Sequence, residues 1–224
     1  MNTLMKSDVA DLGFALSGFG APLPGLNGLD TAGLNLLATV LAPEDAAARN
    51  SIFGWMPENS VKGKDPEQAF FNELETAFEL GLKAEGYTFV KFSDGKKKIV
   101  TYVFYNPLKG CVLEKSAKSH KDLCGVTVAV WGQEKGVAPS FVNPGNYQSY
   151  YFSSYGHNFT RFSFIGAAKD DFTQFEILKS VSKNMPDWAF MYLAPKQISL
   201  NAQSRNPVPL VLDQGEPLYF VISN

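Results

Sequence analysis

The feature that most constrains the fold is a helix start followed by a strand, in residues 65–93. The stretch "DPEQAFFNELETAFELGLKAEGY" opens with Asp65 as an N-cap, Pro66 at the first helical position and Gln68 placed to close a capping box. Apolar residues then recur at helical spacing: Phe70, Leu74, Ala77, Phe78 and Gly81. Gly86 follows where a left-handed residue ends many helices. The pattern predicts an amphipathic helix with one buried face.

Strand patterns follow this helix. "YTFVKF", the turn "SDGK" and the alternating "KIVTYVFY" predict a hairpin, and "GVTVAVW" predicts a third strand after an intervening loop. Residues 65–135 therefore read as one unit, in which a helix precedes three antiparallel strands.

The C-terminal third shows the same order. Asp171 is placed to cap "FTQFEILKSVSKN", Pro186 ends that helix, and "WAFMYLA", "VPLVLD" and "LYFVIS" predict three strands. We expect an α+β fold of two helix-plus-three-strand units, residues 65–135 and 171–224, with an antiparallel sheet and helices on one face. Residues 136–170 form an aromatic-polar connection containing a strand. Duplication is a hypothesis, because the halves share few identical residues; residues 65–224 would equally suit a single domain.

Residues 1–64 differ in composition from the rest of the chain. The stretch "LGFALSGFGAPLPGLNGLD" is small, apolar and rich in Gly and Pro, which predicts an irregular wrapping segment. Short helices are predicted in "TAGLNLLATVLA", capped by Asp30, and in "PEDAAARN". We expect this segment to cover the main core, with contact to a membrane or a partner as the alternative.

Charge and motifs exclude several classes of function. The net charge is −2 and no basic stripe interleaves with aromatics, so nucleic-acid binding is not expected. No transmembrane span is visible, and Asp8 and Asp11 interrupt what would be the apolar region of a signal peptide. If the protein is exported, we expect its signal segment to be missing from this chain. No glycine-rich phosphate loop precedes a helix, so nucleotide chemistry is not indicated and no cofactor is expected. No G-x-S-x-G elbow occurs, which argues against a serine nucleophile of that type.

Cys111 and Cys124, the only two cysteines, allow four interpretations. The spacing Cys-x8-His-x3-Cys gives three zinc ligands, with His157 or Asp122 as a fourth, but matches no familiar zinc motif. A cysteine nucleophile would use His120 as its base. Both cysteines could also be reduced and inert. The fourth interpretation is a disulfide.

The flanking strands favour the disulfide. Ile99–Tyr105 and Val126–Trp131 are natural hairpin partners, and the cysteines lie near the base of the excursion between them. Closing a loop of this length stabilises the fold by about 3 kcal/mol. A disulfide indicates an oxidising compartment, the periplasm or the cell exterior. Lys115, Lys118 and Lys121 would then decorate an exposed loop.

The stretch "NPGNYQSYYFSSYGHNF", residues 143–159, has the most unusual composition. Tyrosines among Ser, Gly and Asn are typical of adaptable recognition surfaces. The candidate contact residues are Tyr147, Tyr150, Tyr151, Tyr155 and His157. If the segment is extended, Tyr147, Tyr151 and Tyr155 point to one side and Tyr150 and Phe152 to the other, so one set can pack on the core while the other faces solvent. The alternative is that all of these rings only cover the edge of the core. A rival hypothesis is a hydrolase in which His157 activates Ser153 or Ser154.

The helix and strand "AFFNELETAFELGLKAEGYTFV", residues 69–90, resemble the opening of small Gram-negative periplasmic lipoproteins, which include envelope and secretion accessory subunits. The resemblance implies a periplasmic location. The lipid-bearing cysteine of that class is absent here, so lipid anchoring stays open.

We therefore expect a non-enzymatic, extracytoplasmic binding or accessory protein of the bacterial cell envelope, with another protein or a glycan as its partner. The alternatives are an inhibitor or immunity protein against a secreted effector and the hydrolase that uses His157. No metal site is expected.

Overall fold

The computed structural model describes most of the chain after residue 48. The described residues are 49–61, 63–93, 99–111, 124–140, 142, 147–152, 159–165, 174–196, 198–201 and 204–219. The short helices predicted before residue 49 and the cap predicted at Asp171 lie outside these ranges.

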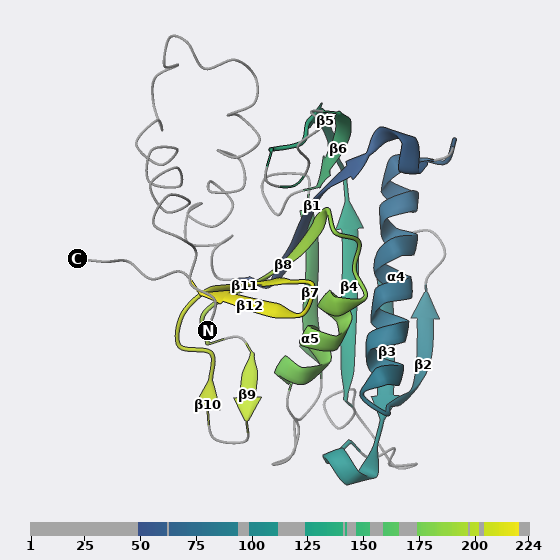
Figure 1. The fold of residues 1–224 in the computed structure, drawn as a ribbon. Coiled ribbons are helices and arrows are strands. Elements are labelled where there is room, and N and C mark those ends of the chain that lie inside the picture. Colours follow the sequence, from purple (N-terminus) through teal and green to yellow (C-terminus); the bar gives the residue numbers. More distant parts are fainter. Residues whose placement is uncertain are drawn as a thin grey trace, which may run out of the picture.

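The predicted first helix is confirmed as α4, Pro66–Ala84 (Figure 1). The Asp65 side chain accepts a hydrogen bond from Glu67 N at 3.1 Å, and Gly86 adopts φ +75° after the last turn. One detail differs from the predicted capping box, because Gln68 Nε2 donates to Asn72 Oδ1 at 2.9 Å. The second helix is α5, Gln174–Lys183. Neither described helix has the length and hydropathy needed to cross a bilayer.

The strands alternate with turns and two 3-10 helices. The 3-10 helices are η1 (Glu58–Val61) and η2 (Pro107–Lys109). The strands are β1 (Ser51–Pro57), β2 (Thr88–Ser93), β3 (Ile99–Tyr105), β4 (Gly125–Trp131), β5 (Glu134–Val137), β6 (Gln148–Phe152), β7 (Phe159–Ile165), β8 (Ala189–Leu193), β9 (Ser199–Asn201), β10 (Ser204–Arg205), β11 (Leu210–Asp213) and β12 (Glu216–Tyr219).

Both predicted meanders are present in one continuous antiparallel sheet, although the last strand begins at Glu216, two residues earlier than predicted, and residues 220–223 of the predicted strand lie outside the described residues. The order is β12-β11-β8-β1-β7-β4-β3-β2, with β6 and then β5 attached beside β1 and with β9–β10 as a separate pair. The chain crosses the sheet in the same direction in both meanders. Helix α4 leads to the outermost strand β2, whereas α5 leads to β8, which lies next to β1. Read from β2 to β12, each meander therefore has its strands in sequence order, with β7 and β1 between the two meanders.

Strand β1 was not recognised in the sequence, where its residues fell in the wrapping segment. It pairs with β8 on one side and with β6 and β7 on the other, and all seven of its residues are buried. A strand covered on both faces has no polar alternation, which explains why period-two patterning did not reveal it.

Around β1, the sheet is buried on both faces. Residues Ile52 and Met56 of β1 point to the face that packs on α4 and α5, while Phe53 and Trp55 point to the opposite face. The two helices lie together over the first face (Figure 1). The opposite face carries a compact aromatic cluster, made by Phe53, Trp55, Tyr151, Phe190 and Tyr192. The two described helices, α4 and α5, therefore pack on the same face of the sheet, as expected from the sequence.

Candidate functional site

The predicted disulfide is present. Cys111 and Cys124 are bonded to each other, with their Cα atoms 5.6 Å apart, and both residues are buried. They lie where the expected pairing of β3 with β4 begins, since Val103 is opposite Gly125. Because both sulfurs are in the bond, neither serves as a zinc thiolate or a nucleophile in this state. His120 and the rest of the loop lie outside the described residues.

The aromatic stretch is described in part. The structure describes Tyr147 and strand β6, whereas Tyr155, His157 and the two serines of the hydrolase hypothesis lie outside the described residues. Strand β6 lies between β1 and β5, so it is an inner strand of a small branch of the sheet (Figure 1). We call β5 and β6 together the β5–β6 ribbon.

Two adjacent rings of β6 anchor the ribbon on opposite faces of the sheet. Tyr151 is 6% exposed and stacks on Trp55, with ring centroids 5.2 Å apart. Phe152 is fully buried and stacks on Phe70 of α4 at 3.9 Å. Neighbouring side chains of β6 therefore point to two faces that are both buried. The predicted division into rings that anchor and rings that face solvent does not hold for Tyr151 and Phe152. Tyr151 is a core residue and its ring is not available to a partner.

Two tyrosines of the stretch remain accessible. Tyr147 is 40% exposed, and partial burial, with the charge of Asp187, raises the pKa of its hydroxyl. Tyr150 is half-buried at the edge of the helix-side core. These two rings are the candidate contact residues that the geometry leaves open.

A charged pair accompanies Tyr150. Lys135 of β5 lies directly opposite Tyr150 in the register, and its Nζ is 5.8 Å from the ring centroid. The same ammonium forms an ion pair with Glu58 of η1, and this hydrogen bond is the main cause that raises the pKa of Lys135. Both charges are exposed, so the pair positions side chains and adds little stability. The Lys135 ammonium, the Glu58 carboxylate and the Tyr150 ring thus lie together on the helix-side face of the ribbon.

The backbone edge of β5 completes the site. Ala138 N donates to Tyr147 O at 3.5 Å. In an antiparallel pair, every second residue directs its backbone N–H and C=O toward the neighbouring strand, so Gly136 and Glu134 also bond toward β6. The N–H and C=O groups of Lys135 and Val137 consequently point away from β6. Within the part of the chain that the structure describes, β5 pairs with β6 alone. A strand edge with outward-pointing backbone groups is a template for another strand.

Sequence reasoning missed Lys135, Glu58 and the β5 edge. A signal existed in "WGQEKGV", where Gly132 at φ +70° separates two strand-length segments. The segment is short and polar, however, and only the register of β5 on β6 brings Lys135 to Tyr150. The pairing of Lys135 with Tyr150 is therefore visible only in the structure.

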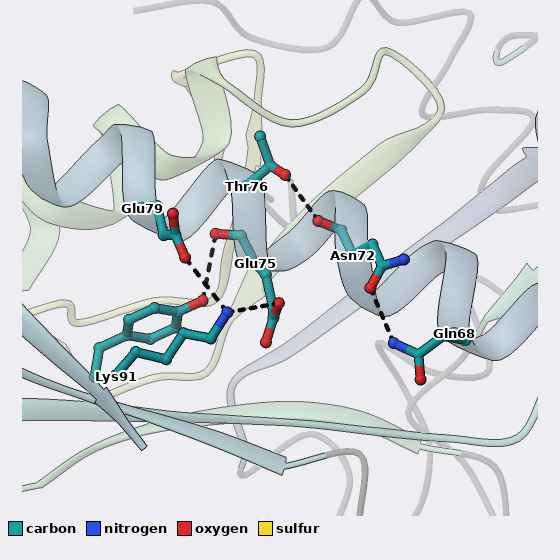
Figure 2. Close-up of polar contacts among 7 residues, drawn as sticks. Gln68, Asn72, Glu75, Thr76, Glu79 and Lys91 are labelled. Carbon is teal, nitrogen blue, oxygen red and sulfur yellow. Dashed lines mark hydrogen bonds and ion pairs between the residues drawn. The ribbon is translucent and has the colours of Figure 1, made fainter. Parts of the chain in front are cut away.

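A second polar cluster joins α4 to the sheet. Lys91 Nζ of β2 lies 2.9 Å from Glu75 Oε2 and 3.5 Å from Glu79 Oε1, and Tyr102 OH donates to Glu75 O (Figure 2). Farther along the helix, Gln68 contacts Asn72, and Thr76 Oγ1 donates to Asn72 O. The contacts of Lys91 and Tyr102 attach α4 to β2 and β3, whereas the contacts of Asn72 lie within the helix. The cluster has the geometry of a structural ion pair.

A third polar cluster lies at the end of α4. Glu85 accepts from Lys109 Nζ at 2.8 Å through Oε2 and from Ser180 Oγ through Oε1. Burial acts to raise the pKa of the Glu85 carboxyl, but these two hydrogen bonds and the charges of Lys109 and Lys179 outweigh it and hold the pKa below its ordinary value. Burial, with the charge of Glu85, raises the pKa of neighbouring Tyr87 to about 12. The ionised carboxylate thus connects α4, α5 and η2.

Among the described residues, no group of three or more His, Cys, Asp or Glu side chains is placed to hold a metal ion. Comparisons of the chain with models of protein families, with curated proteins and with solved structures find no match. The geometry of the described residues is therefore the basis for any functional proposal.

Proposed function

We propose that the protein is a non-enzymatic, extracytoplasmic binding protein that docks an extended segment of another protein along the β5 edge. The observation that carries the proposal is the outward-pointing backbone of Lys135 and Val137, beside the accessible ring of Tyr150. Strand addition uses such an edge for affinity and neighbouring side chains for specificity.

The ribbon is suited to this role because it is rigid. Phe152 and Tyr151 hold β6 in the core from both faces, so the docking edge is ordered before a partner arrives. A preorganised edge loses little conformational entropy on binding. Gly136 adds access, since a Cβ built at this position would meet nothing within 4 Å.

The compartment is part of the proposal. The buried Cys111–Cys124 bond supports an oxidising location, the periplasm or the cell exterior, because such bonds do not persist in most cytosols. A role as an envelope accessory subunit is consistent with that location.

A peptide library displayed on phage tests the docking edge. Peptides are selected on the intact protein and then measured against Val137→Pro, which removes one outward N–H, and against Tyr150→Ala. We expect both variants to weaken binding at least tenfold, which corresponds to about 1.4 kcal/mol. Leu80→Ala, on the exposed face of α4, is the matched control and should bind normally.

Thermal melting of each variant separates folding from binding. Val137→Pro should keep the ladder to β6, because an outward N–H takes no part in it. If the selected peptides bind Val137→Pro and Tyr150→Ala as tightly as the unmodified chain, or if no peptide is selected, strand addition at β5 is wrong.

A further inference from the structure

The side of the sheet that faces away from α4 and α5 carries a group of five buried rings. We call this group the aromatic face, and its members are Phe53, Trp55, Tyr151, Phe190 and Tyr192, each between 0% and 8% exposed. The rings stack on one another, with Phe53 and Phe190 5.4 Å apart and Trp55 and Tyr151 5.2 Å apart. Neighbouring rings on a sheet cover each other's edges, but their tops stay exposed unless a second layer lies over them. Burial this complete therefore requires a covering layer.

The described elements do not supply that layer. The other buried members of the cluster are Ala138, Ala194 and Val211, which belong to the sheet strands or directly follow them, and Val142 and Leu218 pack against it in part. Both described helices pack on the opposite side of the sheet. Neither they nor the β9–β10 pair contributes a described residue to the cluster.

The cover is local, because the same side of the sheet becomes accessible farther along. Ser51 of β1 pairs with Arg161 of β7, so Arg161 and Ser163 share the side of the aromatic face. Ser163 is exposed, and Thr127, opposite it on β4, is half-buried. Val90 of β2 shares this side through the registers of β3 and β4, and it is 51% exposed. The missing layer thus lies over the aromatic face and leaves the strands beyond β7 open.

The residues that cover the aromatic face belong to the same chain, because the exposed fractions are those of a single chain. Outside the described residues, the longest segment is 1–48. The next longest is 112–123, whose ends the disulfide joins at the β3–β4 side of the sheet. The aromatic face extends over four adjacent strands, β6, β1, β8 and β11 with Val211, a width of about 15 Å. Residues 1–48 are the segment long enough to cover it.

Residues 1–48 also end beside the aromatic face. They lead into β1, whose first residue, Ser51, pairs with Tyr192. Asn50 is buried, and its Oδ1 accepts a hydrogen bond from Ala194 N at 2.9 Å. Tyr192 and Ala194 both belong to the cluster. Covalent geometry holds residue 48 within about 10 Å of Ser51, so the segment needs no long connection to reach the rings.

The composition of residues 1–48 suits a covering layer. The segment contains ten leucines and two phenylalanines against six charged residues, and residues 12–29 carry no charge. In the short helix predicted within residues 31–42, Leu34, Leu37 and Leu41 recur at helical spacing and form one apolar stripe. An apolar stripe of this kind packs on another apolar surface, and the aromatic face is such a surface.

We propose that residues 1–48 dock on the aromatic face of their own chain and form a third layer of the fold, opposite α4 and α5. Apolar side chains of the segment lie over the rings of Trp55, Phe190 and Tyr192. The segment is then part of the folded domain, and it is not a tail that contacts a membrane or a partner. This proposal does not depend on the function proposed for the β5 edge.

A lipid surface and a second copy of the chain are the competing contacts for a leucine-rich segment. Attachment to lipid would draw the segment away from the sheet and leave five adjacent rings in water. Apolar patches of that size are rare on monomeric proteins. A second copy would bring its own segment to the aromatic face, which exchanges the same contact between two chains. The test separates these cases.

Photocrosslinking of the full chain tests the docked segment. A benzophenone-bearing residue replaces Phe19 in one chain and Leu37 in another, and the matched control carries it at Leu80, on the exposed face of α4. Equal amounts of isotope-labelled and unlabelled chains are mixed and irradiated, and mass spectrometry maps the adducts. From at least one of positions 19 and 37 we expect adducts with β1, β8 or β11 of the same chain. Position 80 should give none with these strands.

Three outcomes would overturn the proposal. The first is that neither position 19 nor position 37 gives an adduct with β1, β8 or β11. The second is that the adducts join labelled to unlabelled chains, which would assign the contact to a second copy. The third is that, with vesicles of phosphatidylcholine and phosphatidylglycerol present, both positions react with lipid in place of the sheet.

Hydroxyl-radical footprinting gives a second readout on the aromatic face. The double variant Leu34→Asp with Leu37→Asp places two charges on the apolar stripe of the segment. We expect Tyr192 to lose its protection from oxidation, whereas Phe70, which is buried on the helix side, keeps its protection. Leu80→Asp is the matched control and should leave both rings protected. Unchanged protection of Tyr192 in the double variant would show that these leucines do not cover the aromatic face.

Discussion

Phe152 of β6 and Phe70 of α4 stack with their ring centroids 3.9 Å apart and their planes inclined by 14°. The contact joins the aromatic stretch, which looked like a surface feature in the sequence, to the main helix. It also fixes which tyrosines beside Phe152 remain accessible, since the next residue, Tyr151, must face the opposite side of the sheet.

Phe152→Ala should destabilise the fold strongly. Truncating a buried aromatic ring typically costs about 3–5 kcal/mol through lost burial and the cavity that remains. Tyr150→Ala is the control on the same strand and should cost about 1 kcal/mol or less, because its ring is only half-buried. Chemical denaturation measures both. Equal losses would show that Tyr150 is also a core residue.

Replacing both Cys111 and Cys124 by Ala should lower the free energy of unfolding by about 3 kcal/mol, because the unfolded chain regains the entropy of the open loop. Calorimetry of the double variant gives the value. In protein from an oxidising compartment, mass spectrometry of unreduced peptides should show the two peptides linked. Free thiols at both positions would contradict the disulfide and the proposed compartment together.

Gly81→Ala should destabilise the protein although alanine favours helices. An added Cβ would lie 2.6 Å from Val181 Cγ2 and 2.7 Å from Val181 N, where α4 and α5 touch. Overpacking of this kind costs about 1–3 kcal/mol. Gly136→Ala is the matched control, because its Cβ would meet nothing within 4 Å. Melting temperatures compare the two, and an unaffected Gly81→Ala would mean that the helices separate readily.

The Glu85 cluster should make stability depend on pH in the acidic range. Its folded pKa is below the ordinary value of 4.5, so the stabilisation is fully present above that pH and is lost as pH falls through the folded pKa. Glu85→Gln should therefore be less stable than the unmodified protein at pH 7, and the difference should shrink below pH 4.5. Urea denaturation across this range measures it; a constant difference would exclude ionisation as the cause.

Local signals in the sequence determined much of the fold. Asp65, Pro66 and Gly86 placed both ends of α4 because caps act within one helical turn. The hairpin patterns placed β2, β3 and β4, and the position of the two cysteines at the base of β3 and β4 gave the disulfide. Each of these inferences needed only residues that are close in the chain or that flank one loop.

Tertiary structure alone decided the position of β1, the burial of Tyr151 and the approach of Lys135 to Tyr150. Strand β1 lies between β8 on one side and β6 and β7 on the other, and pairing over such separations depends on the packing of the whole sheet. Alternation shows that neighbouring side chains point to opposite faces, but not whether a face is covered. Both faces of β6 are covered, so Tyr151, which the sequence offered as a contact residue, is buried in the core together with Phe152.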